Sequence, residues 1–161
     1  MDNLGQINDR QILYLSTRQT KNWADSLPTN NWVVVPIGHD TDSKVIDDLA
    51  IKCLEKNTLY VCALGQQCEL IHDTFDHYIV QRKIDKSESI DNPIDFEGAS
   101  MTTWHKDFDE GFWFATETAY PTINDEYIFV DKVVCIDTTT NGEKERLPNL
   151  ILKINSEKTK N

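Results

Sequence analysis

The chain has few cysteines and few glycines, and their spacing excludes several kinds of site. The four cysteines form no C-x-x-C pair, so a metal knuckle built from two such pairs is excluded. Three of them lie in apolar patterns, where free thiols behave as small hydrophobic groups, and we expect all four to be reduced and unpaired. The six glycines form neither G-x-G-x-x-G nor G-x-x-x-x-G-K-[ST], the loops that hold nucleotide phosphates.

Long apolar runs are also lacking. No stretch approaches the roughly 20 apolar residues of a membrane span. The N-terminal residues carry neither the basic leader nor the unbroken apolar run of a secretory signal. We therefore expect a cytoplasmic protein with no membrane partner.

Basic residues are scarce relative to acidic ones. The chain has 16 Lys and Arg against 27 Asp and Glu, which gives a formal net charge of −11. Phosphate backbones are bound through Lys and Arg, and no basic stripe is visible, so we expect no nucleic-acid partner. The 161 residues, of which 39% are hydrophobic, suit one globular domain spanning 1–161 with its core at about 30–154.

Three short apolar segments predict buried strands. NWVVVPIG at 31–38 is rich in β-branched residues and closed by a glycine, and TLYVCALG at 58–65 repeats this pattern. A weaker strand is expected at 99–105. Apolar runs of this length are typical of parallel strands that are covered on both faces.

A helix is predicted after each of these strands. Asp42 or Ser43 is placed to cap the first helix, and the second begins near Cys68. Asp107 and Glu110 match a capping box for the third. Strands that alternate with helices indicate βαβ units, which require parallel strands. The predicted fold is therefore α/β, a three-layer Rossmann-like sandwich with a mostly parallel sheet.

The last third of the chain predicts an antiparallel C-terminal hairpin at the edge of this sheet. Residues 126–139 read as one long strand, NGEKER as a turn and NLILKI at 149–154 as the returning strand. We expect a flexible tail at 155–161. The segment 84–98 has five acids against one lysine, and we expect it to be a mobile, solvated loop.

Ionisable side chains gather where the predicted parallel strands end. In open parallel sheets, ligands bind beyond the carboxyl ends of the strands. His39 and Asp40 follow the first strand, Cys68 follows the second, and Trp104 and His105 end the third. The sequence therefore predicts a site at this edge.

A cysteine-dependent reaction is one interpretation of this site. A thiol at a helix N-terminus is stabilised as the thiolate, so Cys68 is a candidate nucleophile, with His72 or His105 as its base. Asp73 or Asp107 would orient that base. The structural alternative is that Cys68 belongs to the apolar stripe of its helix and Asp107 serves only as a cap.

A metal site is a weaker interpretation of the same region. Imidazole nitrogens and the Cys68 thiol are suitable donors, with carboxylates nearby, but only Cys68 and His72 have a suggestive spacing. We predict neither a bound metal nor a cofactor.

Carboxylates outnumber bases at the same edge, where only Lys44 and Lys106 are positive. Such a field repels anions and attracts basic proteins. The residues expected to bind a basic partner are His39, Asp40, Trp104, Asp107, Asp109 and Glu110 at the edge, with Asp91 and Asp95 in the acidic segment.

Two stretches resemble a family of small bacterial domains of unknown function. They are C-x-x-x-H-D-x-x-D, which begins at Cys68, and M-T-T-W-H, which ends at His105. The resemblance spans roughly residues 30–136 and supplies no activity. It implies that one unit contains Cys68, His72, Asp73, Asp76, Trp104 and His105.

Two functions follow from these observations. The first is a small acidic cytosolic binding protein that neutralises a basic partner, as immunity proteins and antitoxins do. The alternative is a cysteine/histidine-dependent or metal-assisted hydrolase or transferase with its site at the carboxyl edge of the sheet.

Overall fold

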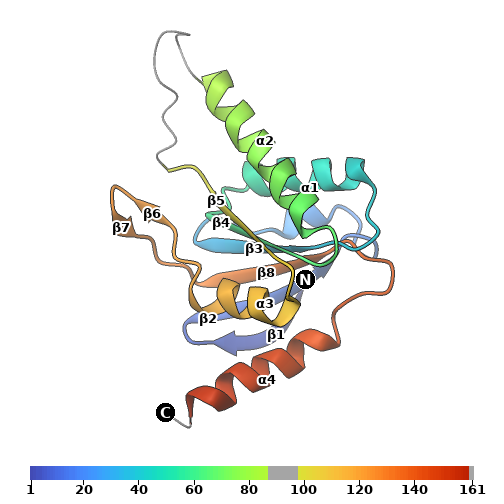
Figure 1. Ribbon diagram of the computed structural model, residues 1–161, viewed down its shortest axis with the longest axis vertical. Helices are drawn as coiled ribbons and strands as arrows, with labels where there is room; N and C mark the ends of the chain where they lie inside the picture. The colour runs from blue at the N-terminus through green and yellow to red at the C-terminus, as the bar shows by residue number, and fades with distance from the viewer. Residues whose placement is uncertain (87–97, 160–161) are drawn as a thin grey trace.

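The computed structural model describes residues 1–86 and 98–159. Its main feature is a six-stranded sheet with the order β1-β2-β8-β3-β4-β5 (Figure 1). The strands are β1 (Asp2–Ile7), β2 (Arg10–Ser16), β3 (Trp32–Ile37), β4 (Tyr60–Leu64), β5 (Met101–His105) and β8 (Lys132–Asp137). All neighbouring pairs are parallel except β1 and β2. The prediction of a mostly parallel sheet in an α/β fold is thus confirmed.

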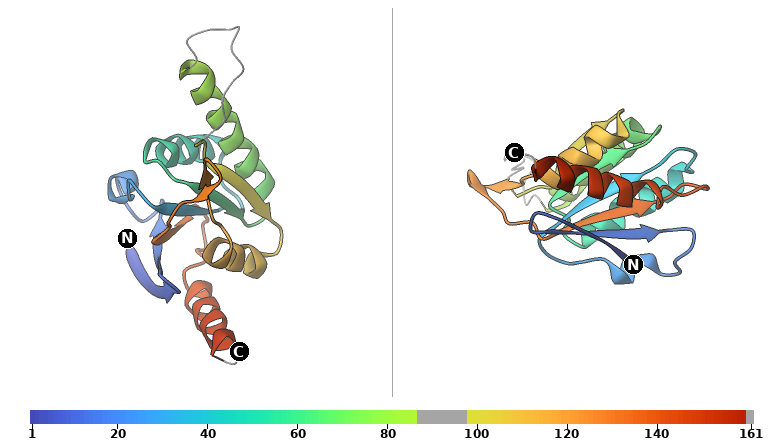
Figure 2. Two further views of the ribbon diagram at one scale, coloured as in Figure 1. Left: turned by 90° about the vertical axis from the view of Figure 1, so that its left-hand side faces the viewer. Right: turned by 90° about the horizontal axis from the view of Figure 1, so that it is seen from below.

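Helices cover both faces of this sheet (Figures 1 and 2). Helices α1 (Ser43–Glu55) and α2 (Cys68–Lys86) pack on one face with the short 3-10 helix η1 (Trp23–Ser26), around a core that contains Trp32 and Phe75. Helices α3 (Phe108–Glu117) and α4 (Arg146–Lys158) cover the other face, where Phe112 and Leu147 are buried.

The predicted helix caps are present. The Asp42 carboxylate accepts a hydrogen bond from the Lys44 backbone N–H at 2.8 Å, and the Asp107 carboxylate accepts one from the Glu110 N–H at 2.9 Å. Each cap satisfies a backbone donor that has no partner within its own helix. Both helices therefore begin at the carboxyl edge of the sheet, where the strands before them end.

The predicted C-terminal hairpin is wrong. Strand β8 lies in the middle of the sheet, parallel to both β2 and β3, and residues 149–154 belong to α4. The apolar residues Leu147, Leu150, Ile151 and Ile154 recur at helical spacing and are buried together. A short apolar run can satisfy both periods, and here Leu147, two residues before the run, extends the helical spacing and favours the helix.

Antiparallel pairing occurs at two other places. Strand β1 pairs with β2 at one edge of the main sheet, and β6 (Thr122–Ile123) pairs with β7 (Glu126–Tyr127) in a separate two-stranded sheet.

The predicted tail and acidic loop are partly helical. Residues 155–158 are the last residues of α4, so the expected tail is helical there. Residues 84–86 likewise continue α2. Most of the predicted acidic loop, with Asp91 and Asp95, lies outside the described residues.

Among residues 1–86 and 98–159, none of the helices combines the length and the apolar character that crossing a bilayer would require.

Candidate functional site

The loops that follow the parallel strands meet at one edge of the sheet, as the sequence predicts. Strands β3 and β8 are neighbours there, but the chain leaves β3 for α1 on one face and β8 for α4 on the other. Such a reversal opens a crevice between the departing loops. A cleft of about 770 Å³ lies at this edge, and it is lined by His39, Gly65, Gln66, Cys68, Glu69, Lys106, Asp107, Phe108, Asp109 and Arg146.

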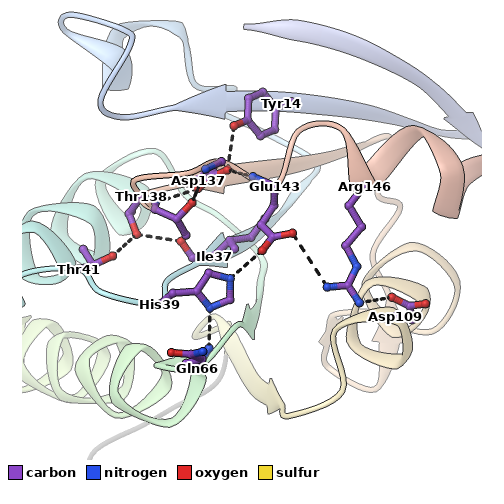
Figure 3. Close-up of polar contacts among 12 residues, drawn as sticks. Tyr14, Ile37, His39, Thr41, Gln66, Asp109, Asp137, Thr138, Glu143 and Arg146 are labelled. Atoms are coloured by element: carbon purple, nitrogen blue, oxygen red, sulfur yellow. Dashed lines mark hydrogen bonds and ion pairs between the residues drawn. The ribbon is translucent and has the colours of Figure 1, made fainter.

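His39 lies at the centre of this edge with both ring nitrogens engaged (Figure 3). Its Nδ1 accepts a hydrogen bond from the backbone N–H of Gln66 at 3.0 Å. That bond requires a lone pair on Nδ1, so the proton of the neutral ring is on Nε2, which lies 2.8 Å from Glu143 Oε1 and donates to it. The ring therefore has no free nitrogen for a substrate.

A glycine allows the His39 and Gln66 loops to approach so closely. Gly65 has a φ of +94°, and a Cβ at this position would lie 2.4 Å from the carbonyl oxygen of Gly38. Any side chain would both strain the backbone and push the two loops apart. The geometry of His39 thus depends on Gly65.

A buried aspartate at the end of β8 positions the loop that carries Glu143. Asp137 is 0% exposed. Its carboxylate accepts hydrogen bonds from the Tyr14 hydroxyl at 2.8 Å, the Glu143 backbone N–H at 2.6 Å, and both the N–H and the hydroxyl of Thr139 at 2.8 and 2.7 Å. Burial, with a further contribution from this carboxylate, raises the pKa of Tyr14.

Hydrogen-bonded threonines join the loops after β3 and β8 (Figure 3). The Thr138 hydroxyl donates to the Ile37 carbonyl at 2.8 Å and accepts from the Thr41 hydroxyl at 2.5 Å. The side-chain amide of Gln67 accepts a hydrogen bond from the Thr41 backbone N–H at 2.8 Å and donates one to the Thr41 carbonyl at 3.0 Å. The loops after β3, β4 and β8 are therefore cross-linked at the carboxyl edge of the sheet, which restricts their movement relative to one another.

Ion pairs occupy the rim of the cleft. Arg146 lies 2.6 Å from Asp109 and 4.0 Å from Glu143, with its guanidinium 4.2 Å from the centre of the Phe108 ring. Lys106 pairs with Glu69 at 2.9 Å, and this partner raises the pKa of Lys106. The charged groups that line the cleft are thus largely satisfied by one another.

The other predicted binding residues lie around this edge. The Asp40 carboxylate accepts from the Thr140 hydroxyl at 2.8 Å, which lowers the pKa of Asp40. Glu110 is exposed in the first turn of α3 but does not line the cleft. Trp104 is exposed at the end of β5, with the Lys106 ammonium 5.4 Å from its ring centre.

Among the residues named for the cysteine-dependent reaction, Cys68 and the helix cap Asp107 line the cleft, whereas His72, Asp73 and His105 do not. Cys68 is the candidate nucleophile. Its side chain is 2% exposed, and burial raises the pKa of the thiol despite its position at a helix start. His105 lies on the α3 face, with its ring centre 4.9 Å from that of Phe114. Its buried Nε2 has no hydrogen-bond partner among residues 1–86 and 98–159, and burial lowers the pKa of the ring.

His72 and Asp73 belong to a separate cluster between α2 and β5. The His72 ring lies 3.1 Å from Asp73 and 3.3 Å from the Thr102 hydroxyl, which donates to Asp76 at 2.6 Å. This cluster joins the C-x-x-x-H-D-x-x-D stretch to the M-T-T-W-H stretch. It does so through Thr102, which the sequence did not single out. Within the part of the chain that the structure describes, no side-chain hydrogen bond or ion pair joins Cys68 to His72 or to His105.

Within the part of the chain that the structure describes, no three or more His, Cys, Asp or Glu side chains are grouped so that they could hold a metal ion.

A family model for a domain of unknown function, DUF7684, matches residues 10–154. The chain belongs to the DUF7684 family. This match confirms the predicted membership of a family of domains of unknown function. No curated protein and no solved structure matched the chain.

The DUF7684 match contains every residue that lines the cleft, together with the buried Asp137 and its partner Tyr14. Asp137, Glu143 and Arg146 are not among the residues that the sequence predicts for the site, because the pattern of the segment that carries them predicts an edge hairpin. One signal was available, since Asp137 directly follows the apolar run KVVCI and precedes three threonines. A carboxylate at the end of a buried strand marks a candidate site in an open parallel sheet.

Proposed function

We propose that this DUF7684 chain is a small acidic binding protein that occupies a basic protein partner in the cytoplasm, as immunity proteins and antitoxins do, with the cleft at its binding face. The arrangement of the cleft is the observation that carries this proposal. His39 has no free ring nitrogen, and the Cys68 thiol is buried with a raised pKa. A rigid, charged surface without a free base or an exposed nucleophile is suited to recognition rather than to reaction.

The charge around the cleft indicates the chemistry of the partner. Acidic residues outnumber the basic ones at this edge, which are Arg18, Lys44, Lys106, Lys144 and Arg146. The acidic residues of the edge are Asp40, Asp42, Glu69, Asp107, Asp109, Glu110 and Glu143. In a chain with a net charge of −11, such an edge steers a basic protein towards the cleft and repels nucleic acid.

The enzymatic alternative has one observation in its favour, namely that Cys68 lines the cleft. A hydrolase or transferase would also need a base within hydrogen-bond reach of the thiol. His39, the histidine among the residues that line the cleft, is already bonded at both nitrogens, and His105 does not line the cleft. The geometry therefore supports the binding function better.

A Rossmann-like three-layer arrangement is part of the same proposal. Its support is the reversal of the strand order between β3 and β8, with helices on both faces of the sheet. In folds of this kind the crevice at the reversal is the usual place for a ligand.

Charge reversal at the rim tests the proposal. The partner is first captured from cells that produce the chain by using the wild-type protein as bait, and association rates are then measured with that partner at several salt concentrations. The double variant Asp109→Lys, Glu110→Lys is expected to associate about tenfold more slowly at low salt and with a flatter salt dependence, because it removes steering charge.

The matched control is Glu55→Lys, Glu157→Lys, which makes the same change in net charge at exposed positions in the last turns of α1 and α4. This control should keep most of the association rate. Capture of no basic protein, or equal rates for the rim and control variants, would contradict the proposal.

A further inference from the structure

We propose that three exposed aromatic residues, Tyr120, Tyr127 and Phe129, form a second docking surface that takes an arginine-bearing segment of a protein partner. The pocket beside these residues includes Arg10 at the start of β2 and Val130 just before β8, so the aromatic surface lies at the edge of the sheet opposite the cleft. The β6–β7 hairpin projects from the rest of the fold (Figure 1). It goes beyond the proposed function, because it requires neither the cleft nor any residue of its rim.

A tight hairpin presents this aromatic surface. Asn124 and Asp125 connect β6 to β7 with φ values of 52° and 61°, and Thr122 pairs with Tyr127. Positive φ at both central residues is typical of the two-residue turns that match the twist of a β-hairpin. The hairpin therefore holds Tyr127 in a defined position outside the core.

The aromatic residues are far more exposed than packing requires. Tyr127 is 77% exposed, Phe129 61% and Tyr120 47%. They border a pocket of about 330 Å³, which is lined by Asn8, Asp9, Arg10, Tyr120, Tyr127, Ile128, Phe129 and Val130. Contiguous exposed aromatic area with a polar border is typical of an interaction site, and tyrosine is among the residues enriched at the centres of interfaces.

The buried side chain of Arg10 supports the Tyr120 ring from the interior of the protein. Arg10 is buried and donates to the backbone carbonyls of Ala115 and Ala119 at 2.8 and 2.9 Å. Its guanidinium carbon lies 4.6 Å from the centre of the Tyr120 ring, and the Tyr120 and Tyr127 rings meet edge to face at 5.9 Å. Arg10 thus orients the aromatic surface, but its donors are already used inside the protein.

The exposed carboxylates beside the aromatic surface indicate which kind of partner binds there. Asp9 lines the pocket, and Asp125 and Glu126 precede Tyr127 in the hairpin. All three are exposed, and among residues 1–86 and 98–159 no basic group lies within ion-pair distance of them, whereas nearby Glu117 and Asp131 are paired with lysines.

An aromatic surface bordered by free carboxylates attracts a basic segment and repels both a second copy of itself and a nucleic acid. Arginine fits better than lysine, because its planar guanidinium stacks on aromatic faces while it pairs with carboxylates.

The test uses two short blocked Gly/Ser peptides that differ only in carrying arginines or lysines. Each is titrated into the full ¹⁵N-labelled chain. The arginine peptide is expected to bind several-fold more tightly and to shift the amide signals of residues 120–130 first. The double variant Tyr127→Ala, Phe129→Ala should weaken its binding by about tenfold or more.

The matched control is Trp113→Ala, Leu152→Ala, which removes two exposed apolar side chains elsewhere, and it should bind like the wild type. Equal affinity for the two peptides, equal loss in the control, or first shifts at His39 and Gln66 would overturn the proposal. A dimer in sedimentation that is lost in the Tyr127→Ala, Phe129→Ala variant would assign the surface to a second copy and would equally overturn it. Reversal of charge at Asp109 and Glu110 leaves this surface unchanged, so the two proposals can fail separately.

Discussion

Two histidines at the carboxyl ends of the parallel strands β3 and β5, which flank β4, lie in opposite environments. His39 bonds through both nitrogens, to Gln66 and Glu143, and holds two loops together. His105 instead packs on Phe114, and its buried Nε2 has no hydrogen-bond partner in the described part of the chain. Gly111 gives this ring its space, since a Cβ there would lie 2.6 Å from that of His105. His105 is thus a packing residue that favours its neutral form.

The lowered pKa of His105 predicts a specific loss of stability in mild acid. Burial lowers the pKa from about 6.5, against a smaller opposing effect of Glu110, so the unfolded chain takes up this proton at a higher pH than the folded protein. The stability due to the neutral ring is complete above about pH 6.5 and is lost as the pH falls below it.

Replacing the ring removes that titration. In urea unfolding at about pH 7 and about pH 5, the free energy of unfolding of His105→Phe should fall less than that of the wild type. The control His77→Gln removes an exposed histidine and should keep the wild-type slope. A steeper fall in His105→Phe would show that the ring is protonated more readily in the folded state.

At the scale of elements, the sequence predicted the strands and helices that depend on interactions between residues close together in the chain. Strands β3 and β4 are continuous apolar runs, and the caps Asp42 and Asp107 begin α1 and α3. The insertion of β8 between β2 and β3 depends on pairing between residues that are 100 and 121 positions apart, which no local period reports. Because NLILKI fits a strand as well as a helix, β8 was assigned to the wrong edge, and the residues after it were lost from the predicted site.

Asp137 is expected to be the main connection between β8 and the loop that carries Glu143. In Asp137→Asn, one carboxylate oxygen becomes an NH₂ group. In either orientation this group faces a backbone N–H, that of Thr139 or that of Glu143, so one buried donor loses its acceptor. The free energy of unfolding should fall by about 1–3 kcal/mol in urea titrations, and the Glu143 amide should exchange its proton faster.

Tyr14→Phe is the matched control for this prediction. It removes one hydrogen bond to Asp137 but leaves both backbone donors satisfied, so it should cost only about 0.5–1.5 kcal/mol and leave Glu143 exchange nearly unchanged. Equal costs for the two variants would mean that Asp137 acts through Tyr14 rather than through the loop.

At the scale of the whole molecule, two candidate binding surfaces lie at opposite edges of the sheet. Fixed loops form the cleft at the carboxyl edge, and a hairpin presents the aromatic surface at the amino edge (Figures 1 and 3). Both lie in a field set by the excess of carboxylates. The sequence predicted this field and the position of the cleft, because charge and the direction of parallel strands follow from residues alone. The position of the aromatic surface, in contrast, depends on which aromatic side chains remain exposed after the core has packed.

The net charge of −11 predicts that moderate salt stabilises the chain. Self-repulsion extends over about 30 Å at 0.01 M salt and about 8 Å at 0.15 M, whereas exposed ion pairs contribute little that salt can remove. The urea midpoint should therefore rise between these salt concentrations. The variant Asp9→Asn, Asp125→Asn, Glu126→Gln lowers the net charge to −8 and should show a smaller rise. A midpoint that falls with salt would mean that ion pairs such as Arg146–Asp109 outweigh the repulsion.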